Sequence, residues 1–371
     1  MLRGSRKKRR SGLGLAAFTA ALAYLFLAHR PLGGNSPLEL VATLTLPESR
    51  VSLAEAPARK ESDISFSSTA GFGFLDLESR ELKYYARPEG AAEEGSRLIV
   101  PNTQNGSLEL WDRSLGSKRS LSGGGLPYLQ SGRLFAIRMD QSGASEYDSE
   151  GKLLWSWEFG SFLTSSSIGE RASAWGCMDG TILIQREGHS GLELLRPSAF
   201  GSPPARDCVY GVAISPEGKR LAVLYGQEPQ NALFFEERGS GWGLAHSVRL
   251  PRTSFRAQEA LFSQDGTWAV MQTASGLLVY DAASRTSSLQ LSGTIGEDDS
   301  LRFVRLGDTA IAFLAASKAE RRFGLMRGSA LEAWIRVEDG ASGIVADERG
   351  YVSIAGETSL RVYAERKEVG R

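Results

Sequence analysis

Histidine and cysteine, which supply many of the metal ligands and nucleophiles of proteins, are scarce in this chain. Its 371 residues include three histidines and two cysteines, too few for a zinc finger or a disulfide-dense scaffold. His189 and His246 lie in turn-like contexts, REGHSG and LAHSV, with neither metal-ligand spacing nor an acid–nucleophile pattern beside them. We therefore interpret both as surface or turn histidines.

Two charged clusters offer the remaining polar chemistry. Glu297, Asp298 and Asp299 could ligate calcium, which needs several oxygen ligands, but a lone acidic run is more often a solvated loop. Arg321 and Arg322 could form a basic contact at a rim, although a solvated hairpin tip is the default interpretation. The chain also lacks the Asp-x-Asp metal motif of anchored glycosyltransferases. The sequence therefore predicts no catalytic, cofactor-binding or metal-binding residues, no cofactor and no enzyme activity.

The overall composition is that of a globular protein whose chain turns often. Hydrophobic residues make up 42% and charged residues 23%, and 42 glycines accompany only 13 prolines. Six of the 43 Lys and Arg residues lie in the first ten positions, which leaves 37 cations against 43 anions, a formal −6, for residues 11–371. A mildly acidic body argues against a general nucleic-acid binder.

The first thirty residues predict a membrane anchor. A basic head, residues 1–10, precedes an uncharged apolar run that continues to Ala28. As a helix this run is about 27 Å long, enough to cross a thin bilayer core. The charge asymmetry keeps the head in the cytoplasm and exports the remainder. We therefore expect a transmembrane anchor, or uncleaved signal, over residues 11–29 and a linker over residues 30–37.

A cleaved signal peptide and a buried globular helix are the alternatives for this segment. Cleavage after Ala28 would put Phe26 at the −3 position, which favours small residues. No cysteine follows the apolar run, so the chain is not a bacterial lipoprotein. These observations favour a single-pass protein of an inner or plasma membrane whose C-terminal part is periplasmic or extracellular.

Beyond the linker, two sequence marks recur at a period of about 40–45 residues. The first is a turn with an acidic residue or glycine followed by an apolar strand, as in ISPEGKRLAVL (214–224) and FSQDGTWAVM (262–271). In the second, a strand ends in an aromatic residue or Leu, then Asp, then a turn, as in SEYDSEGKLLW (145–155). Asp in that place accepts backbone hydrogen bonds and fixes the hairpin. Three or four strands per unit at this period are typical of a β-propeller.

Individual repeats resemble those of known propellers. Trp111–Asp112 and the segment ISPEGKRLAV are similar to repeats of the WD40-like superfamily, and YDSEGKLLW (147–155) is similar to repeats of quinoprotein-like propellers. The resemblance covers about residues 38–371 and implies a propeller of a divergent bacterial type. Quinoprotein-like enzymes carry a Trp-docking motif in nearly every blade and a pair of adjacent cysteines. This chain has one good copy of that motif, at Trp155, and no adjacent cysteines, so its seven tryptophans are interpreted as blade-packing residues.

The number of units predicts the number of blades. Counting by the first long strand gives eight units, with starts near residues 64, 97, 132, 172, 219, 267, 309 and 351. We expect an all-β fold with a single propeller of about eight blades over residues 38–371, and seven blades as the alternative because the first two units are short. The last unit lacks a strand, so LELVATLTL (38–46) is predicted to pair with the strand near residues 360–365 and close the ring.

Placing the two cysteines on blades predicts where their thiols lie relative to one another. Cys177 ends the apolar strand ASAWGC, and Cys208 precedes the strand VYGVAI of the next unit. In a blade that runs from inside outward, the turn after the second strand and the start of the next blade lie on one face. The thiols are thus expected on the same side of neighbouring blades, where an exported chain could join them in a disulfide. The alternative is two small buried hydrophobic residues.

Together these features favour a membrane-anchored, exported propeller that acts as a protein-interaction platform in the cell envelope, as a scaffold or in the assembly of envelope proteins. Loops on the two faces of a rigid disc are where binding residues usually lie. The quinoprotein-like repeat resembles propeller subunits that assist outer-membrane protein assembly, although those are lipid-anchored. The expected partner is another envelope or membrane protein, not a nucleic acid. The alternatives are a propeller hydrolase or lyase, which would need carboxylates, histidines or a metal at the central channel, and a ligand-sensing ectodomain.

Overall fold

The computed structural model describes the chain beyond its N-terminal segment, over residues 37–47, 60, 62–94, 97–102, 106–112, 117–201, 204–239, 241–338 and 340–366. The predicted cytoplasmic head, the predicted anchor and most of the predicted linker lie outside these residues. Within the described part, no helix combines the length and the apolar character needed to cross a membrane.

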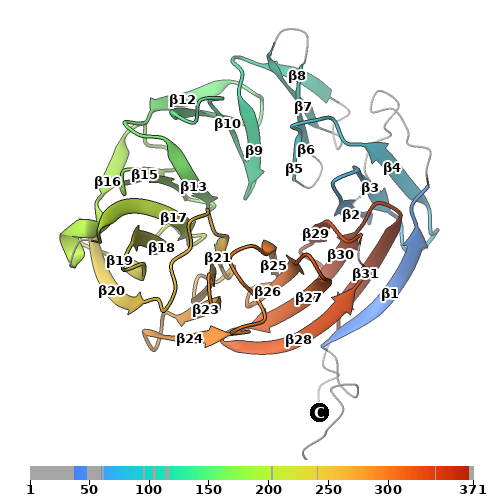
Figure 1. Cartoon of the computed structure of the whole chain (residues 1–371). Coiled ribbons are helices and arrows are strands. Elements are labelled where there is room, and N and C mark those ends of the chain that lie inside the picture. The colour runs from blue at the N-terminus through green and yellow to red at the C-terminus, as the bar shows by residue number, and fades with distance from the viewer. Residues whose placement is uncertain are drawn as a thin grey trace, which may run out of the picture.

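Nearly all regular structure in the described residues is short β-strand, gathered into eight antiparallel sheets around a common centre (Figure 1). We number these sheets as blades 1 to 8. The first four blades contain β2 (Ile64–Ser67), β3 (Gly71–Leu75) and β4 (Leu82–Ala86); β5 (Ala92–Glu94), β6 (Arg97–Pro101), β7 (Leu108–Asp112) and β8 (Ser117–Leu121); β9 (Leu126–Gln130), β10 (Arg133–Ile137), β11 (Gly143–Tyr147) and β12 (Leu153–Glu158); and β13 (Leu163–Ile168), β14 (Ala172–Cys177), β15 (Ile182–Arg186) and β16 (Leu192–Leu195).

The last four blades follow the same plan. They contain β17 (Arg206–Ile214), β18 (Arg220–Gln227), β19 (Asn231–Arg238) and β20 (Gly241–Arg249); β21 (Ala260–Phe262), β22 (Trp268–Thr273), β23 (Gly276–Asp281) and β24 (Thr286–Gln290); β25 (Ser300–Leu306), β26 (Ala310–Ala316), β27 (Arg321–Arg327) and β28 (Ala330–Val337); and β29 (Gly343–Ala346), β30 (Tyr351–Ala355), β31 (Ser359–Glu365) and β1 (Leu38–Thr45). A short 3₁₀ helix, η2 (Pro197–Phe200), connects blades 4 and 5.

The eight-bladed count is confirmed, and the seven-bladed alternative is wrong. The starts expected from the sequence fall within one residue of the starts of β2, β6, β10, β14, β18, β22, β26 and β30. In every four-stranded blade this is the second strand, which is long, apolar and preceded by the recurring turn. The sequence repeat therefore marks the second strand of a blade and not its inner strand.

Closure of the ring by the N-terminal strand is also confirmed. β1 is the outer strand of blade 8 and pairs antiparallel with β31, from Leu38 opposite Glu365 to Thr45 opposite Ser359. The side chain of Leu38 is buried in the cluster between blades 7 and 8. The first and last described strands thus lie in one sheet, in which β1 covers the edge that β31 would otherwise expose.

The core lies between blades and not within one central layer. Eight hydrophobic clusters are formed, and each joins residues of two neighbouring blades. All seven tryptophans lie in these clusters or pack against them, which confirms their interpretation as blade-packing residues. Because every interface buries its own apolar surface, the ring positions its loops rigidly.

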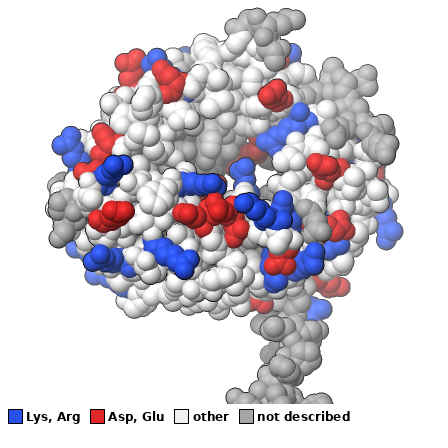
Figure 2. All heavy atoms as spheres, viewed as in Figure 1, with Lys and Arg blue, Asp and Glu red and all other residues white. Residues whose placement is uncertain are grey.

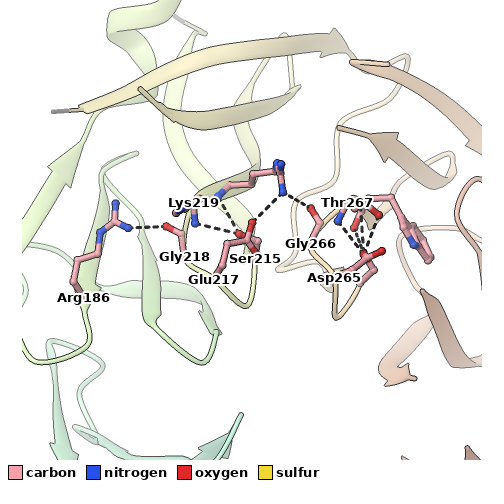
Figure 3. A network of polar contacts seen from close by, with 11 residues as sticks. Arg186, Ser215, Glu217, Gly218, Lys219, Asp265, Gly266 and Thr267 are labelled. Atoms are coloured by element: carbon pink, nitrogen blue, oxygen red, sulfur yellow. Dashed lines mark hydrogen bonds and ion pairs between the residues drawn. The ribbon is translucent and has the colours of Figure 1, made fainter. Parts of the chain in front are cut away.

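Hydrogen bonds between blades explain why the turn-and-strand mark recurs (Figure 3). In blade 6, Asp265 accepts the backbone N–H and the hydroxyl of Thr267 within the turn. Gly266 adopts a positive φ of 66°, and its carbonyl oxygen accepts a 3.0 Å hydrogen bond from Arg220 of blade 5. Equivalent contacts, from an arginine to a carbonyl oxygen of the next blade, are Arg97–Gly132, Arg186–Gly218 and Arg349–Asp63. The repeat therefore encodes a blade-to-blade contact as well as a hairpin.

The disc has two unlike faces, which we name by their loops. The turn face carries the turns between first and second strands, such as residues 215–219 and 263–267. The connection face lies opposite. It carries the links between blades, such as residues 250–259, and the turns between second and third strands, such as residues 138–142.

Candidate functional site

The inner strands surround a central channel, and Figure 2 shows charged side chains of both signs beside the central opening. Glu259 lies immediately before the inner strand β21, Arg302 lies in the inner strand β25, and both residues are exposed. Desolvation nevertheless raises the pKa of the Glu259 carboxyl, against the opposing effect of the Arg302 charge. An exposed carboxyl that surrounding protein desolvates is expected inside a narrow, solvent-filled opening.

Tyr128 brings a third blade into this group. It lies in the inner strand β9 of blade 3 and interacts electrostatically with Glu259 of blade 6 and Arg302 of blade 7. Burial raises the pKa of its phenol to about 12, and the charge of Glu259 adds to this effect. The hydroxyl donates to Gln130 Oε1 at 3.1 Å. With this pKa the phenol stays protonated at neutral pH and acts as a hydrogen-bond donor.

Arg305 narrows the channel at the turn face. From β25 of blade 7, its Nη1 donates to Ser131 Oγ of blade 3 at 3.3 Å, and its Nε donates to the Phe262 carbonyl at 2.9 Å. Blades 3 and 7 are opposite in a ring of eight, so the side chain reaches across the channel. Next to Ser131, Gly132 donates its N–H to Glu94 at 2.8 Å, and burial raises the pKa of that carboxyl.

In the part of the chain that the structure describes, the channel gathers charges without pairing a nucleophile with a base. Its carboxylates in the described part include Glu94, Glu170 and Glu259, which are accompanied by guanidinium groups and a protonated phenol. Among the described residues, no group of three or more His, Cys, Asp or Glu is placed to hold a metal ion. Sequence reasoning missed this cluster because its members come from separate blades, so no linear motif connects them.

Large apolar side chains gather on the connection face over blades 3 to 6. These side chains, with their exposed fractions, are Met139 (73%), Phe162 (56%), Met178 (54%) and Phe255 (61%). Residues of this kind are usually buried, and all four lie in loops. The Met178 N–H donates to the Phe162 carbonyl at 2.9 Å, and the Leu163 N–H donates to the Gln141 carbonyl at 2.9 Å, so neighbouring loops are fixed to one another. We call these four side chains the apolar patch.

A hollow of about 600 Å³ opens within the apolar patch. It is lined by Gln141, Leu163, Thr164, Met178, Arg206, Asp207, Cys208, Tyr210, Gln227, Phe255 and Ala257. Two of its polar groups are held in place, because the Tyr225 hydroxyl donates to Asp207 and the Gln227 amide donates to the Tyr210 hydroxyl. The hollow thus combines an apolar border with oriented polar groups, which is the usual make-up of a binding surface.

A second hollow, of about 560 Å³, lies at the rim between the outer strands β16 and β20. Leu194, Phe200 and Trp242 contribute to its wall. The Trp242 indole N–H donates to Glu193 at 3.1 Å, and the Arg186 guanidinium lies 5.3 Å from the Trp242 ring centroid. The side chains of Glu193 and Trp242 are therefore engaged in a contact between blades 4 and 5.

The two histidines occupy different settings. His189 is exposed just after the turn that follows β15, as predicted. The prediction for His246 is wrong, because this residue lies in β20 and not in a turn. Its ring stacks between blades, with centroids 6.0 Å from Phe234 and 5.7 Å from Tyr280, and burial lowers its pKa. The absence of glycine and proline in LAHSV was the available signal for a strand.

The acidic run lies in the loop between β24 and β25, as its default interpretation predicts. Asp298 pairs with Arg256 at 3.0 Å, and Asp299 accepts the Gly296 N–H at 2.9 Å. Of the three carboxylates in the run, those of Asp298 and Asp299 therefore have protein partners. The loop forms part of the connection face.

Arg321 and Arg322 lie at the start of β27, directly after the hairpin turn of residues 317–320. Arg322 pairs with Glu320, and its guanidinium lies 5.5 Å from the Trp334 ring centroid. Both arginines are partly buried. They brace the hairpin and do not form a solvated tip, which corrects the expectation for this pair.

Cys177 and Cys208 are free thiols in the structure. Cys177 is buried at the end of β14, and Cys208 is partly buried in β17, where it lines the hollow. A Cβ at Gly176 would lie 2.4 Å from Val209 Cγ1, so the residues next to the two cysteines pack directly across the blade interface. Burial raises the pKa of both thiols, that of Cys177 to about 11. The structure thus holds the unbonded form, and the disulfide stays a prediction for the oxidised chain.

Comparison with known proteins bears on the fold. A family model described as "beta-propeller protein" matches residues 5–300, about four-fifths of the chain. No curated protein matches the sequence. Among solved structures, BamB from Moraxella catarrhalis is similar, with a TM-score of 0.55 and 12% identity over 88% of this chain and 99% of that chain.

Two further structures have the same general shape. The computationally designed Ika8 protein gives a TM-score of 0.55 at 12% identity, over 83% of this chain and 94% of that one. KlAtg21, solved in complex with the coiled coil of AgAtg16, gives a TM-score of 0.50 at 12% identity, over 76% and 98%. At such identities the likeness concerns the fold alone.

Proposed function

The chain belongs to the family of beta-propeller proteins, and from this premise we propose that it is a protein-interaction platform whose docking surface is the apolar patch. The observation that carries the proposal is the joint exposure of four large apolar side chains on one face. A soluble domain rarely keeps such a group in water unless the group serves an interface. The patch is also preformed, because packed and hydrogen-bonded blades hold its loops.

A protein partner is supported in general terms by a similar structure. KlAtg21 was solved in complex with a coiled coil of AgAtg16, so a propeller of comparable shape holds another polypeptide there. For the present chain we take from this the class of partner and not its identity. We propose further that the chain is not an enzyme, since the described channel residues pair no nucleophile with a base.

The cell envelope is the proposed place of action, with scaffolding or assistance to the assembly of envelope proteins as the role. The support is the basic head of residues 1–10 followed by the uncharged apolar run. The first described residue, Pro37, accepts the Arg366 N–H at 2.8 Å, and Glu365 donates its N–H to Gly350 in a turn of the turn face. A disc tethered through residues 11–29 would therefore attach at its turn face and present the apolar patch away from the membrane.

Site-specific photocrosslinking in intact cells tests this proposal. A photoreactive amino acid is placed at Phe162, Met178 or Phe255, and in matched controls at Leu153 or Leu194, which are similarly exposed on outer strands. We expect the three patch positions to capture the same partner and the two rim positions to capture none. Equal capture from the rim, or no capture from the patch, would refute the apolar patch as the docking surface.

A further inference from the structure

The apolar patch is bordered by carboxylates that have no cationic partner. Asp179 directly follows Met178, Asp207 lines the hollow, and Glu228 follows the hollow residue Gln227. All three are exposed, and none forms an ion pair within the described residues. Arg206, which also lines the hollow, and Arg249 and Arg252, at and just after the end of β20, are exposed cations that form no ion pair within the described residues. At the hollow itself the carboxylates of Asp179 and Asp207 therefore outnumber the single cation Arg206.

The remaining charges near the patch do not reverse this balance. Arg138 lies 3.6 Å from Asp140 and 2.9 Å from Glu158, so one guanidinium serves two carboxylates. Arg256 and Asp298 form a one-to-one pair at 3.0 Å. The described connection-face loops over blades 3 to 6, residues 138–142, 178–181, 196–201, 204–205, 228–230, 250–259 and 291–299, carry seven carboxylates and four arginines, so their sum is acidic.

Two of the unpaired carboxylates are oriented and still have a free oxygen. Oδ1 of Asp179 accepts the N–H of Thr181 at 3.1 Å and its hydroxyl at 2.7 Å. Oδ1 of Asp207 accepts the Tyr225 hydroxyl. In both residues Oδ2 has no hydrogen-bond donor in the described structure. A held carboxylate with one open oxygen is suited to a cationic side chain, since little rotamer entropy is lost on pairing.

We propose that the apolar patch binds a cationic, apolar segment of a partner polypeptide. This inference rests on the proposed function and adds the chemistry of the partner. Large apolar side chains of the segment contact Met178 and Phe255, and Lys or Arg side chains pair with Asp179 and Asp207. The partner's charge is complementary to the acidic border, and methionine side chains adapt to apolar groups of different shape, so the order of apolar residues in the segment is not fixed.

Binding of such a segment has a measurable electrostatic signature. Each pair at this surface is solvent-exposed, and an exposed pair contributes about two- to fivefold in affinity. Salt screens exposed charges within about 10 Å at 0.1 M ionic strength, so affinity for a cationic segment falls as salt is added. Affinity for a neutral segment of the same apolar content does not fall, because burial of apolar surface is not weakened by screening.

The experiment uses the full-length protein in nanodiscs of zwitterionic lipid and three fluorescent peptides of equal length. In these peptides Leu alternates with Lys, with Ser or with Glu, and fluorescence anisotropy reports binding; empty nanodiscs give the background. We expect the Lys peptide to bind most tightly and the Glu peptide least. The double variant Asp179→Asn/Asp207→Asn, which keeps both acceptor oxygens for Thr181 and Tyr225, should weaken the Lys peptide about four- to 25-fold and leave the Ser peptide unchanged.

The control variant Glu187→Gln/Glu348→Gln removes two exposed carboxylates from the turn face and should change nothing. Equal binding of the three peptides, abolished by Met178→Asp/Phe255→Asp, would overturn the charge requirement while the docking surface stands. Binding of the Lys peptide that survives Met178→Asp/Phe255→Asp would overturn both, because the site would lie elsewhere. Absence of binding for all three peptides would overturn the segment as the ligand, and the crosslinking pattern would then decide the docking surface separately.

Discussion

Arg133 of blade 3 forms a buried ion pair with Glu146 and a hydrogen bond to blade 4. Its Nε and Nη2 donate to Glu146 Oε1 at 2.9 and 2.7 Å, and Nη2 also donates to Gln185 of blade 4. The two charged side chains are only 10% and 7% exposed. Desolvation raises the pKa of the Glu146 carboxyl, and the charge of Arg133 opposes this. Removing the arginine would leave a buried carboxylate without a counter-charge.

We expect Arg133→Met to lower the free energy of unfolding by about 3–5 kcal/mol at pH 7. The pKa of Glu146 is already raised in the folded state, and without Arg133 it must rise further. The folded variant therefore binds a proton at a pH where the unfolded chain does not, so its stability relative to the wild type recovers as the pH falls from 7 towards 5. Urea unfolding of both proteins at the two pH values measures this change.

A double variant separates the charge effect from lost packing. Arg133→Met/Glu146→Leu removes both charges, so it should regain much of the lost stability and show the same deficit at both pH values. If the single variant has equal deficits at pH 7 and pH 5, the uncompensated carboxylate of Glu146 is not the cause of its instability.

Single residues also show where sequence reasoning stops. Met139 and Phe162 are isolated apolar residues in polar loops, a weak signal that the alternation of strands obscures. Arg305 and Ser131 are 174 positions apart, and only the closed ring brings them together. Such contacts can be recognised only once the blades are placed around the ring, because the residues are neighbours in space and not along the chain.

At the level of elements, the second strands were predictable and most inner strands were not, with the apolar VYGVAI of β17 as an exception. A second strand such as β22 (Trp268–Thr273) is wholly buried between neighbouring blades, so it reads as an apolar run after a turn. Inner strands such as β13 (Leu163–Ile168, LTSSSI) and the three-residue β5 are short or polar because they border the channel. Without an apolar period they cannot be told from loops in the sequence.

Among the elements, β1 closes the ring, and deletion of residues 38–46 tests how far it protects the edge of β31. Leu38 and Leu46 are buried, and the strand covers the outer edge of β31. Without it, a seven-residue strand with open N–H and C=O groups is exposed, which favours pairing between molecules. We expect the deleted protein to aggregate in a concentration-dependent way, measured by light scattering.

The matched control keeps the strand and changes only its outer side. Leu40 and Val41 are 51% and 44% exposed, so Leu40→Glu/Val41→Glu should leave the pairing with β31 and the monomeric state intact. A deleted protein that remains as monomeric as this control would show that β1 does not protect the edge.

At the scale of the whole molecule, the two faces of the ring have different roles, one in holding the blades together and the other in exposing the proposed docking surface. The turn face holds arginine-to-carbonyl contacts between blades, whereas the connection face exposes the apolar patch. Because blade interfaces and loops use different residues, the docking surface can vary while the ring is kept. The same separation explains why the fold was readable from the repeat and the surface was not.

The topology of the whole chain gives the last prediction. Six cations in the first ten residues and none from residue 11 to 28 place the head in the cytoplasm and the disc outside it, on the proposed reading. Pro37 and Arg366 are hydrogen-bonded neighbours, so a reporter fused after Arg371 follows the same side of the membrane as the disc. A reporter active only in the cytoplasm should be silent in this fusion and active when residues 1–30 are deleted. Activity in the full-length fusion would place the disc in the cytoplasm, and the apolar patch would then have to meet its partner there and not in the envelope.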